Sequence, residues 1–219
     1  MTAADEWGPI FELIAGAGLR RGEALGLRWG DVNMESGTLV IRQQVVQLDG
    51  HTAPCLRCGG SHRGPAFTPP KTASGEARRI ELGQAASGVL LAHRLHQDEV
   101  RSSWGSAYAD HDLVFALDDG NPIHPERLTK RFGMLVGTSG LRHARLHDLR
   151  HARASLLLAS GTDLALVSKM LRHSSVAVTA DTYSHLLEGV GRKAADAANA
   201  LVPRRARAHS VHSSAPEHS

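Results

Sequence analysis

Cationic and imidazole side chains gather around one tyrosine near the end of the chain. Residues 146–151 read Leu-His-Asp-Leu-Arg-His, and residues 171–185 contain Leu-Arg-His and later Thr-Ala-Asp-Thr-Tyr-Ser-His. Upstream, Gly-Leu-Arg-Arg-Gly-Glu occupies 18–23 and Pro-Lys-Thr occupies 70–72. Arginine, lysine, histidine, arginine, histidine and tyrosine, in that order, are suited to attack on a phosphodiester by a phenol.

Two arginines are candidates for stabilising that reaction. A phosphodiester under attack gains negative charge on its non-bridging oxygens, and preorganised cationic donors aimed at those oxygens are the usual source of rate. Arginine suits the task because its planar fork donates paired hydrogen bonds and keeps its charge. We therefore expect Arg20 and Arg150 to hold the phosphate.

Tyr183 is the predicted nucleophile. A phenol has a pKa of about 10, so it needs a base or nearby positive charge to attack at neutral pH. The chain contains two tyrosines, Tyr108 and Tyr183, and only Tyr183 has cationic and imidazole neighbours of this kind in the sequence. Taken alone, a late tyrosine would be interpreted as a helix-packing residue. Within the full set, the nucleophile is the favoured interpretation.

Lys71 is the candidate general acid. The segment 67–82 is predicted to form two short strands about a Ser-Gly turn. A hairpin of this kind can carry an ammonium group into a groove, where it could protonate the departing 5′-oxygen. The alternative is an ordinary solvated lysine on a loop.

Taken together, the motifs resemble the catalytic domain of the tyrosine recombinases, the phage-integrase family, from about Asp5 to Leu201. The resemblance implies a mainly helical α+β fold with a small three-stranded antiparallel sheet. It also implies site-specific DNA recombination or integration through a 3′-phosphotyrosyl intermediate, with no cofactor required for catalysis. The expected partners are double-stranded DNA and further copies of the chain, as a tetramer on DNA.

The resemblance assigns six catalytic residues: Arg20, Lys71, His147, Arg150, His173 and Tyr183. In the family, the residues that match His147 and His173 bond the scissile phosphate and assist proton transfer. Arg172 departs from the family, which usually has glycine at that place. An arginine with positive φ would cost about 1 kcal/mol. Either the turn differs there, or Arg172 makes a compensating phosphate contact.

Two other functions compete with recombination. A type IB topoisomerase uses similar residues on DNA as a monomer, although the predicted hairpin and the spacing of the late motifs favour recombination. A catalytically silent DNA-binding remnant of a truncated integrase is the other alternative. It arises because we expect the family's N-terminal DNA-clamping domain to be absent, since the resemblance to the catalytic domain begins almost at Met1.

The two cysteines of the chain, Cys55 and Cys58, lie between His51 and His62 in an H-x3-C-x2-C-x3-H pattern. This spacing could hold a structural zinc ion on a loop between strands. The alternative is an irregular, glycine-rich insertion with two incidental thiols.

A second metal pattern is weaker. His143, His147 and His151 recur every four residues and would share one face of a helix. Interleaved arginines would repel a divalent cation, and no glutamate lies between the histidines as the metalloprotease motif requires. We therefore do not expect a metal at this position.

Composition is consistent with one well-cored domain that acts on a polyanion. The 219 residues, with a sequence pI of about 9.2, are expected to form a single catalytic domain over 1–202 and a disordered basic tail over 203–219. Aromatic residues make up only 4%, which argues for contact with duplex phosphates over a stacking platform for single strands. We expect a cytoplasmic protein without membrane contact, because the sequence contains no signal peptide and no apolar run of spanning length.

Periodicity predicts the elements that must position these residues. Helices are expected over 5–18, 20–27, 84–104, 125–139, 148–160, 163–171, 176–183 and 186–201. A strand is expected over 38–48, ahead of the hairpin that contains Lys71.

Overall fold

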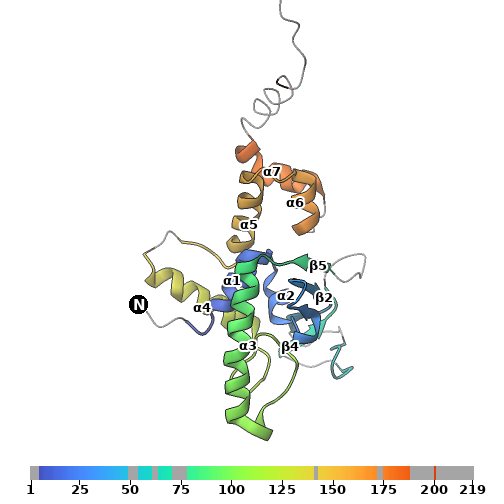
Figure 1. Ribbon diagram of the computed structural model, residues 1–219, viewed down its shortest axis with the longest axis vertical. Helices are drawn as coiled ribbons and strands as arrows, with labels where there is room; N and C mark the ends of the chain where they lie inside the picture. The colour runs from blue at the N-terminus through green and yellow to red at the C-terminus, as the bar shows by residue number, and fades with distance from the viewer. Residues whose placement is uncertain are drawn as a thin grey trace, which may run out of the picture.

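The computed structural model describes residues 5–48, 54–60, 64–70, 78–140, 143–171, 175–187 and 200. Seven α-helices lie in this part of the chain (Figure 1): α1 (Gly8–Ala17), α2 (Arg21–Leu25), α3 (Gln84–Trp104), α4 (Pro125–Thr138), α5 (Asp148–Ala159), α6 (Leu164–Leu171) and α7 (Val176–Leu187). Two 3-10 turns occupy Trp29–Asp31 and Gly105–Ala107.

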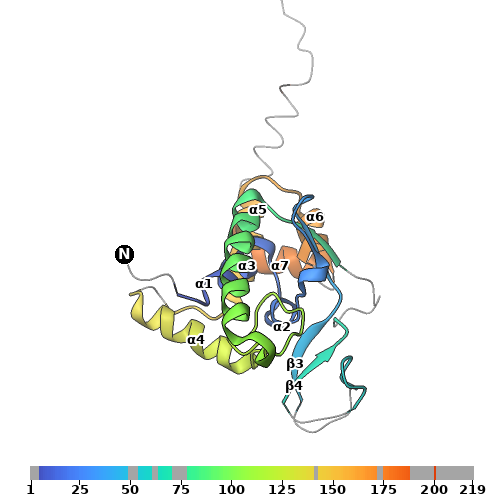
Figure 2. The same cartoon turned by 60° about the horizontal axis from the view of Figure 1, so that its bottom comes forward.

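The strands form two small antiparallel sheets. One has three strands in the order β1-β2-β5, formed by β1 (Val32–Asn33), β2 (Thr38–Ile41) and β5 (Arg78–Glu81). The other pairs β3 (Gln44–Leu48) with β4 (Gly64–Thr68), which project together from the body as an arm (Figure 2). The expected three-stranded sheet is confirmed, but its composition differs from the prediction.

The prediction of one strand over 38–48, followed by a β4–β5 hairpin, was wrong. The chain turns at Arg42 and Gln43, whose side chains bond Asp31 and the carbonyl of Gly26 respectively. This turn carries β3 directly across α2. A Cβ added to Gly26 would lie 2.8 Å from the Cα of Gln44, so the close approach requires glycine. As a result β2 pairs with β5, whereas β3 pairs with β4.

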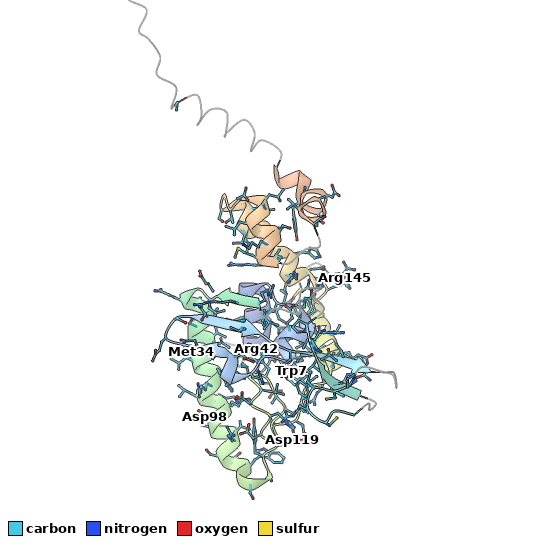
Figure 3. All side chains as sticks on the ribbon, turned by 90° about the vertical axis from the view of Figure 1, so that its right-hand side faces the viewer. Trp7, Met34, Arg42, Asp98, Asp119 and Arg145 are labelled. Carbon is cyan, nitrogen blue, oxygen red and sulfur yellow. The ribbon has the colours of Figure 1, made fainter. Side chains whose placement is uncertain are left out.

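Two groups of buried apolar side chains support the fold. The larger lies among α1, α2, α4 and the sheets and includes Ile10, Leu13, Ile14, Leu25, Leu39 and Leu128. The smaller contains Ala154, Val167, Leu171 and Tyr183, from α5, α6 and α7. Helix α5 connects the two, because Leu146 and Leu149 at its start contact the larger core and Ala154 belongs to the smaller. Figure 3 shows Arg145, just before α5, between the part of the molecule that holds the larger core and the part formed by α5, α6 and α7.

Among the described residues, the predicted helices agree with the structure to within three residues at each end, with one exception, and the helix predicted over 186–201 lies outside the described residues from 188 to 199. The exception is α7, which continues through Tyr183 to Leu187, although Tyr183 itself has non-helical angles (φ −117°, ψ 18°). The predicted tail from 203 onward lies outside the described residues. Among the residues that are described, none of the helices combines the length and apolarity that crossing a bilayer would require.

Gly18 ends α1 in the left-handed conformation, with φ of 65°. A Cβ at this position would lie 2.8 Å from Cδ2 of the buried Leu171, so the end of α1 fits closely against α6. We expect Gly18→Ala to lower the free energy of unfolding by about 1–3 kcal/mol, from backbone strain and overpacking together. Denaturant unfolding measures this effect. Gly133→Ala, in open space within α4, is the control and should be neutral or stabilising.

Candidate active site

The first turn of α5 presents three of the relevant side chains. His147 occupies the N-cap position, and Asp148 accepts a hydrogen bond from the backbone N–H of Arg145 at 2.8 Å, which fixes the entry into the helix. His147, Arg150 and His151 are spaced by three and four residues, so they lie on one face of α5. The rings of His147 and His151 meet edge to face, with centroids 4.8 Å apart.

Arg150 is buried and connects three helices. Its Nη1 donates to the carbonyl of Gly18 at the end of α1, and its Nη2 donates to the carbonyl of Leu171 at the end of α6. Both acceptors lie at helix C-termini, where the helix dipole favours a cation. Burial, followed by the positive charge of Arg20, lowers the Arg150 pKa to about 10. The guanidinium therefore stays charged at neutral pH, and two carbonyls do not exhaust its five N–H donors.

Arg20 is held beside Arg150 by a buried carboxylate. Glu23 accepts from the Arg20 backbone N–H at 2.9 Å and from its Nη1 at 2.8 Å, which closes the N-terminus of α2. The other guanidinium on Glu23 belongs to Arg78 of β5, at 3.0 Å, and Arg78 also donates to the carbonyl of Met170 on α6. The Arg20 side chain remains 33% exposed, so it keeps a face toward solvent.

Tyr183 lies buried at the kink in α7. Its hydroxyl is 2.8 Å from Nδ1 of His151, and the two ring centroids are 6.1 Å apart. Burial raises the Tyr183 pKa, and the positive charge of Arg150 opposes that shift. The phenol is therefore protonated at neutral pH in this structure, with an imidazole in direct contact and a guanidinium near enough to act on it.

His147 is more exposed than its neighbours at the site. Partial burial, followed by the charges of His151 and Arg150, lowers its pKa. A lowered pKa favours the neutral imidazole at physiological pH, in which one nitrogen donates a hydrogen bond and the other accepts one.

The structure thus brings together four of the six predicted residues: Arg20, His147, Arg150 and Tyr183. Lys71 and His173 lie outside the described residues, as does Arg172, so their predicted roles stay predictions.

Three further residues belong to the cluster but were not assigned to it from the sequence: Glu23, Arg78 and His151. Glu23 was visible at the capping-box spacing from Arg20. For His151 the sequence pattern indicates only membership of the histidine trio at helical spacing. Arg78 gave no signal, because its contact with Glu23 joins residues 55 positions apart.

The cysteine pair lies between β3 and β4, as predicted. Cys55 is buried and Cys58 is exposed, and both are free thiols. The backbone N–H of Cys55 donates to the carbonyl of Gly60 at 3.1 Å, which closes the turn that carries both thiols. His51 and His62, the other two predicted zinc ligands, lie outside the described residues. Within the described part of the chain, no three His, Cys, Asp or Glu residues form a group that could hold a metal ion.

Glu23 offers a direct test of how the two arginines are positioned. We expect Glu23→Gln to lower the free energy of unfolding by roughly 3 kcal/mol, because it removes the negative charge paired with the buried Arg78 guanidinium. Thermal or denaturant unfolding measures this loss. Glu12→Gln, at an exposed position on α1, is the matched control and should change stability by less than about 0.5 kcal/mol. Equal stability of the two variants would contradict an anchoring role for Glu23.

Comparison with known proteins identifies the fold and the family of this chain. The fold is that of tyrosine recombinase catalytic domains: the Tn1549 transposon integrase, solved with transposon right end DNA, aligns with a TM-score of 0.67 at 19% identity over 89% of this chain and 59% of that one. XerA recombinase aligns with a TM-score of 0.61 at 20% identity over 93% of this chain and 59% of that one. The model of the phage integrase family matches residues 8–189, and the chain belongs to that family.

Curated relatives agree with this assignment. A tyrosine recombinase XerC-like protein of Caldanaerobacter subterraneus subsp. tengcongensis is 27% identical over 195 residues, which cover 88% of this chain and 49% of the relative. The ICEBs1 integrase of Bacillus subtilis is 27% identical over 179 residues, which cover 82% of this chain and 45% of the relative. The chain therefore spans about half the length of these relatives.

Proposed function

We propose that the protein is a site-specific DNA recombinase that breaks and rejoins DNA through a covalent link to Tyr183. The observation that carries this proposal is the buried Tyr183 hydroxyl, bonded to an imidazole at 2.8 Å and acted on by the charge of Arg150. Family membership supports it. The curated relatives are recombinases and integrases, which favours recombination over a topoisomerase.

In the proposed reaction the Tyr183 oxygen attacks the scissile phosphorus, and the bond from phosphorus to the 5′-oxygen breaks. The products are a 3′-phosphotyrosyl link and a free 5′-hydroxyl, and attack by a 5′-hydroxyl on that link rejoins the strand. Because the bond energy is kept in the covalent intermediate, the cycle needs no nucleotide cofactor.

Arg20 and Arg150 are proposed to stabilise the charge that develops on the phosphate. The charged groups that act on Arg150 include Arg20, Arg78 and Glu23, so three guanidinium groups gather around the Glu23 carboxylate. This local excess of positive charge suits a phosphodiester. Lys71 is proposed to protonate the leaving oxygen, while His147 and His173 bond the phosphate and assist proton transfer.

The proposed partner is double-stranded DNA, and the proposed assembly is a tetramer of this chain on DNA, in the cytoplasm. The DNA complex of the Tn1549 integrase, a structural neighbour, supports the choice of DNA. Catalysis is proposed to need no metal, because arginines supply the positive charge. A structural zinc at Cys55, Cys58, His51 and His62 remains part of the proposal, independent of the chemistry.

Covalent trapping on a nicked duplex tests the proposed function. The nick releases a short fragment after cleavage, so the covalent complex cannot rejoin and accumulates. We expect a denaturation-resistant adduct between protein and DNA. The same yield is expected in the presence of a chelator, because guanidinium groups carry the charge that a metal would otherwise neutralise. Absence of any adduct from a folded, DNA-binding protein would favour the silent-remnant alternative, and loss on chelation alone would point to a metal.

A further inference from the structure

The roles proposed above for the six predicted residues do not involve the contact between His151 and the Tyr183 hydroxyl. We infer that His151 accepts the proton of the Tyr183 hydroxyl during strand cleavage, an inference that rests on the proposed function. It adds a catalytic residue to the site and separates its role from that of His147.

Geometry supports His151 as the acceptor. Its Nδ1 is 2.8 Å from the Tyr183 oxygen, which is within direct hydrogen-bond range for proton transfer. His151 is half-buried on α5, four residues after His147, and the His147 ring stands edge-on against it. His147 is thus placed to support the His151 ring, and His151 is the imidazole in contact with the nucleophile.

The chemistry of the Tyr183 phenol favours a base at this position. Burial makes the Tyr183 phenol harder to ionise, and the charge of Arg150 offsets this only in part. A buried phenol that must attack at neutral pH therefore benefits from a partner that takes its proton as the new bond forms. In the described structure, the His151 imidazole is within hydrogen-bond distance of the Tyr183 oxygen that must lose this proton.

The step balances as follows. The proton moves from the Tyr183 oxygen to the unprotonated Nδ1 of His151 as the bond from oxygen to phosphorus forms. The bond from phosphorus to the 5′-oxygen breaks, and that oxygen takes its proton from the general acid, for which Lys71 is proposed. When the strand is rejoined, the attacking 5′-hydroxyl gives its proton back to that general acid, the bond from phosphorus to the Tyr183 oxygen breaks, and the protonated His151 returns its proton to the departing Tyr183 oxygen.

The test compares two substitutions of His151 in single-turnover cleavage of the nicked duplex. In His151→Asn the amide oxygen can accept a hydrogen bond but cannot take up a proton, whereas His151→Phe removes both abilities. We expect both variants to cleave about a hundredfold more slowly or worse, with unchanged affinity for an intact duplex. His96→Asn, an exposed histidine on α3, is the matched control and should cleave at the wild-type rate.

A fluorinated tyrosine gives a readout that a purely structural role would not change. The chain has only two tyrosines, so Tyr108→Phe leaves Tyr183 as the single site for fluorotyrosine incorporation. A more acidic phenol depends less on a base. Fluorotyrosine should therefore raise the cleavage rate of His151→Asn about tenfold or more. In the protein that keeps His151, fluorotyrosine should change the cleavage rate much less.

Three results would overturn the inference. Wild-type cleavage by His151→Asn would show that a hydrogen bond suffices and that no proton is transferred to this residue. A slow His151→Asn variant that fluorotyrosine does not improve would show a structural role. Failure of the wild-type protein to form any adduct would overturn the proposed function first, and this inference with it.

Discussion

Replacing Tyr183 with phenylalanine is expected to abolish covalent attachment to a nicked duplex while leaving duplex affinity nearly unchanged. The substitution removes the one oxygen that would bond phosphorus and alters no charge at neutral pH. It also removes the hydrogen bond to His151, which should lower stability by only about 1 kcal/mol. Denaturing electrophoresis of labelled DNA measures the adduct, and equilibrium binding to an intact duplex measures affinity.

Tyr108→Phe is the matched control for this experiment. Tyr108 follows the 3-10 turn after α3, where the guanidinium of Arg101 lies over its ring, and it is not among the groups whose charges act on Arg150. The control should form the adduct at the wild-type rate. A denaturation-resistant adduct from Tyr183→Phe would show that another residue is the nucleophile.

Arg150→Lys should reduce both cleavage and stability. A single ammonium group cannot reproduce the fork that reaches the carbonyls of Gly18 and Leu171 and must also hold a phosphate. We expect cleavage to fall by about a hundredfold or more. The free energy of unfolding should fall by about 2 kcal/mol or more, because at least one buried carbonyl loses its donor. Single-turnover cleavage and denaturant unfolding measure the two effects.

Arg20→Lys is the informative counterpart. Its side chain is one-third exposed, so the expected loss of stability is within about 1 kcal/mol, while the loss of cleavage should match that of Arg150→Lys. Near-native cleavage by both lysine variants would contradict the assignment of the two arginines to the phosphate.

The sequence predicted helices better than strand pairing, for physical reasons. The pattern that predicted α3 and α5 is local, since it records which side chains fall on one face of a helix. The partners of β3 and β5 depend on the turn at Arg42 and Gln43, which is fixed by contacts with Asp31 and Gly26. Such contacts join distant positions, and periodicity does not encode them.

The same distinction applies to the site. Residue type, order and spacing led to the prediction of Arg20, Arg150 and Tyr183 as site residues, and the structure places Arg20 and Tyr183 close enough to Arg150 to act on its charge. The anchoring of Arg20 depends on a meeting of α2 with β5 through Glu23 and Arg78, which no local pattern records. His151 was visible at a helical spacing, but that spacing alone did not distinguish a metal ligand from a partner of the tyrosine.

Arg150 also has a consequence for how relatives of this protein can lose activity. Its two carbonyl partners lie at the end of α1, which packs in the larger hydrophobic core, and at the end of α6, which packs in the smaller one. The Arg150 side chain therefore links the two cores as well as taking its proposed part in strand cleavage. A lineage released from selection for strand cleavage can change Tyr183 to phenylalanine at little structural cost, but it cannot change Arg150 as freely. Inactive descendants should therefore retain this arginine long after the tyrosine is gone, and its presence alone is poor evidence of a working enzyme.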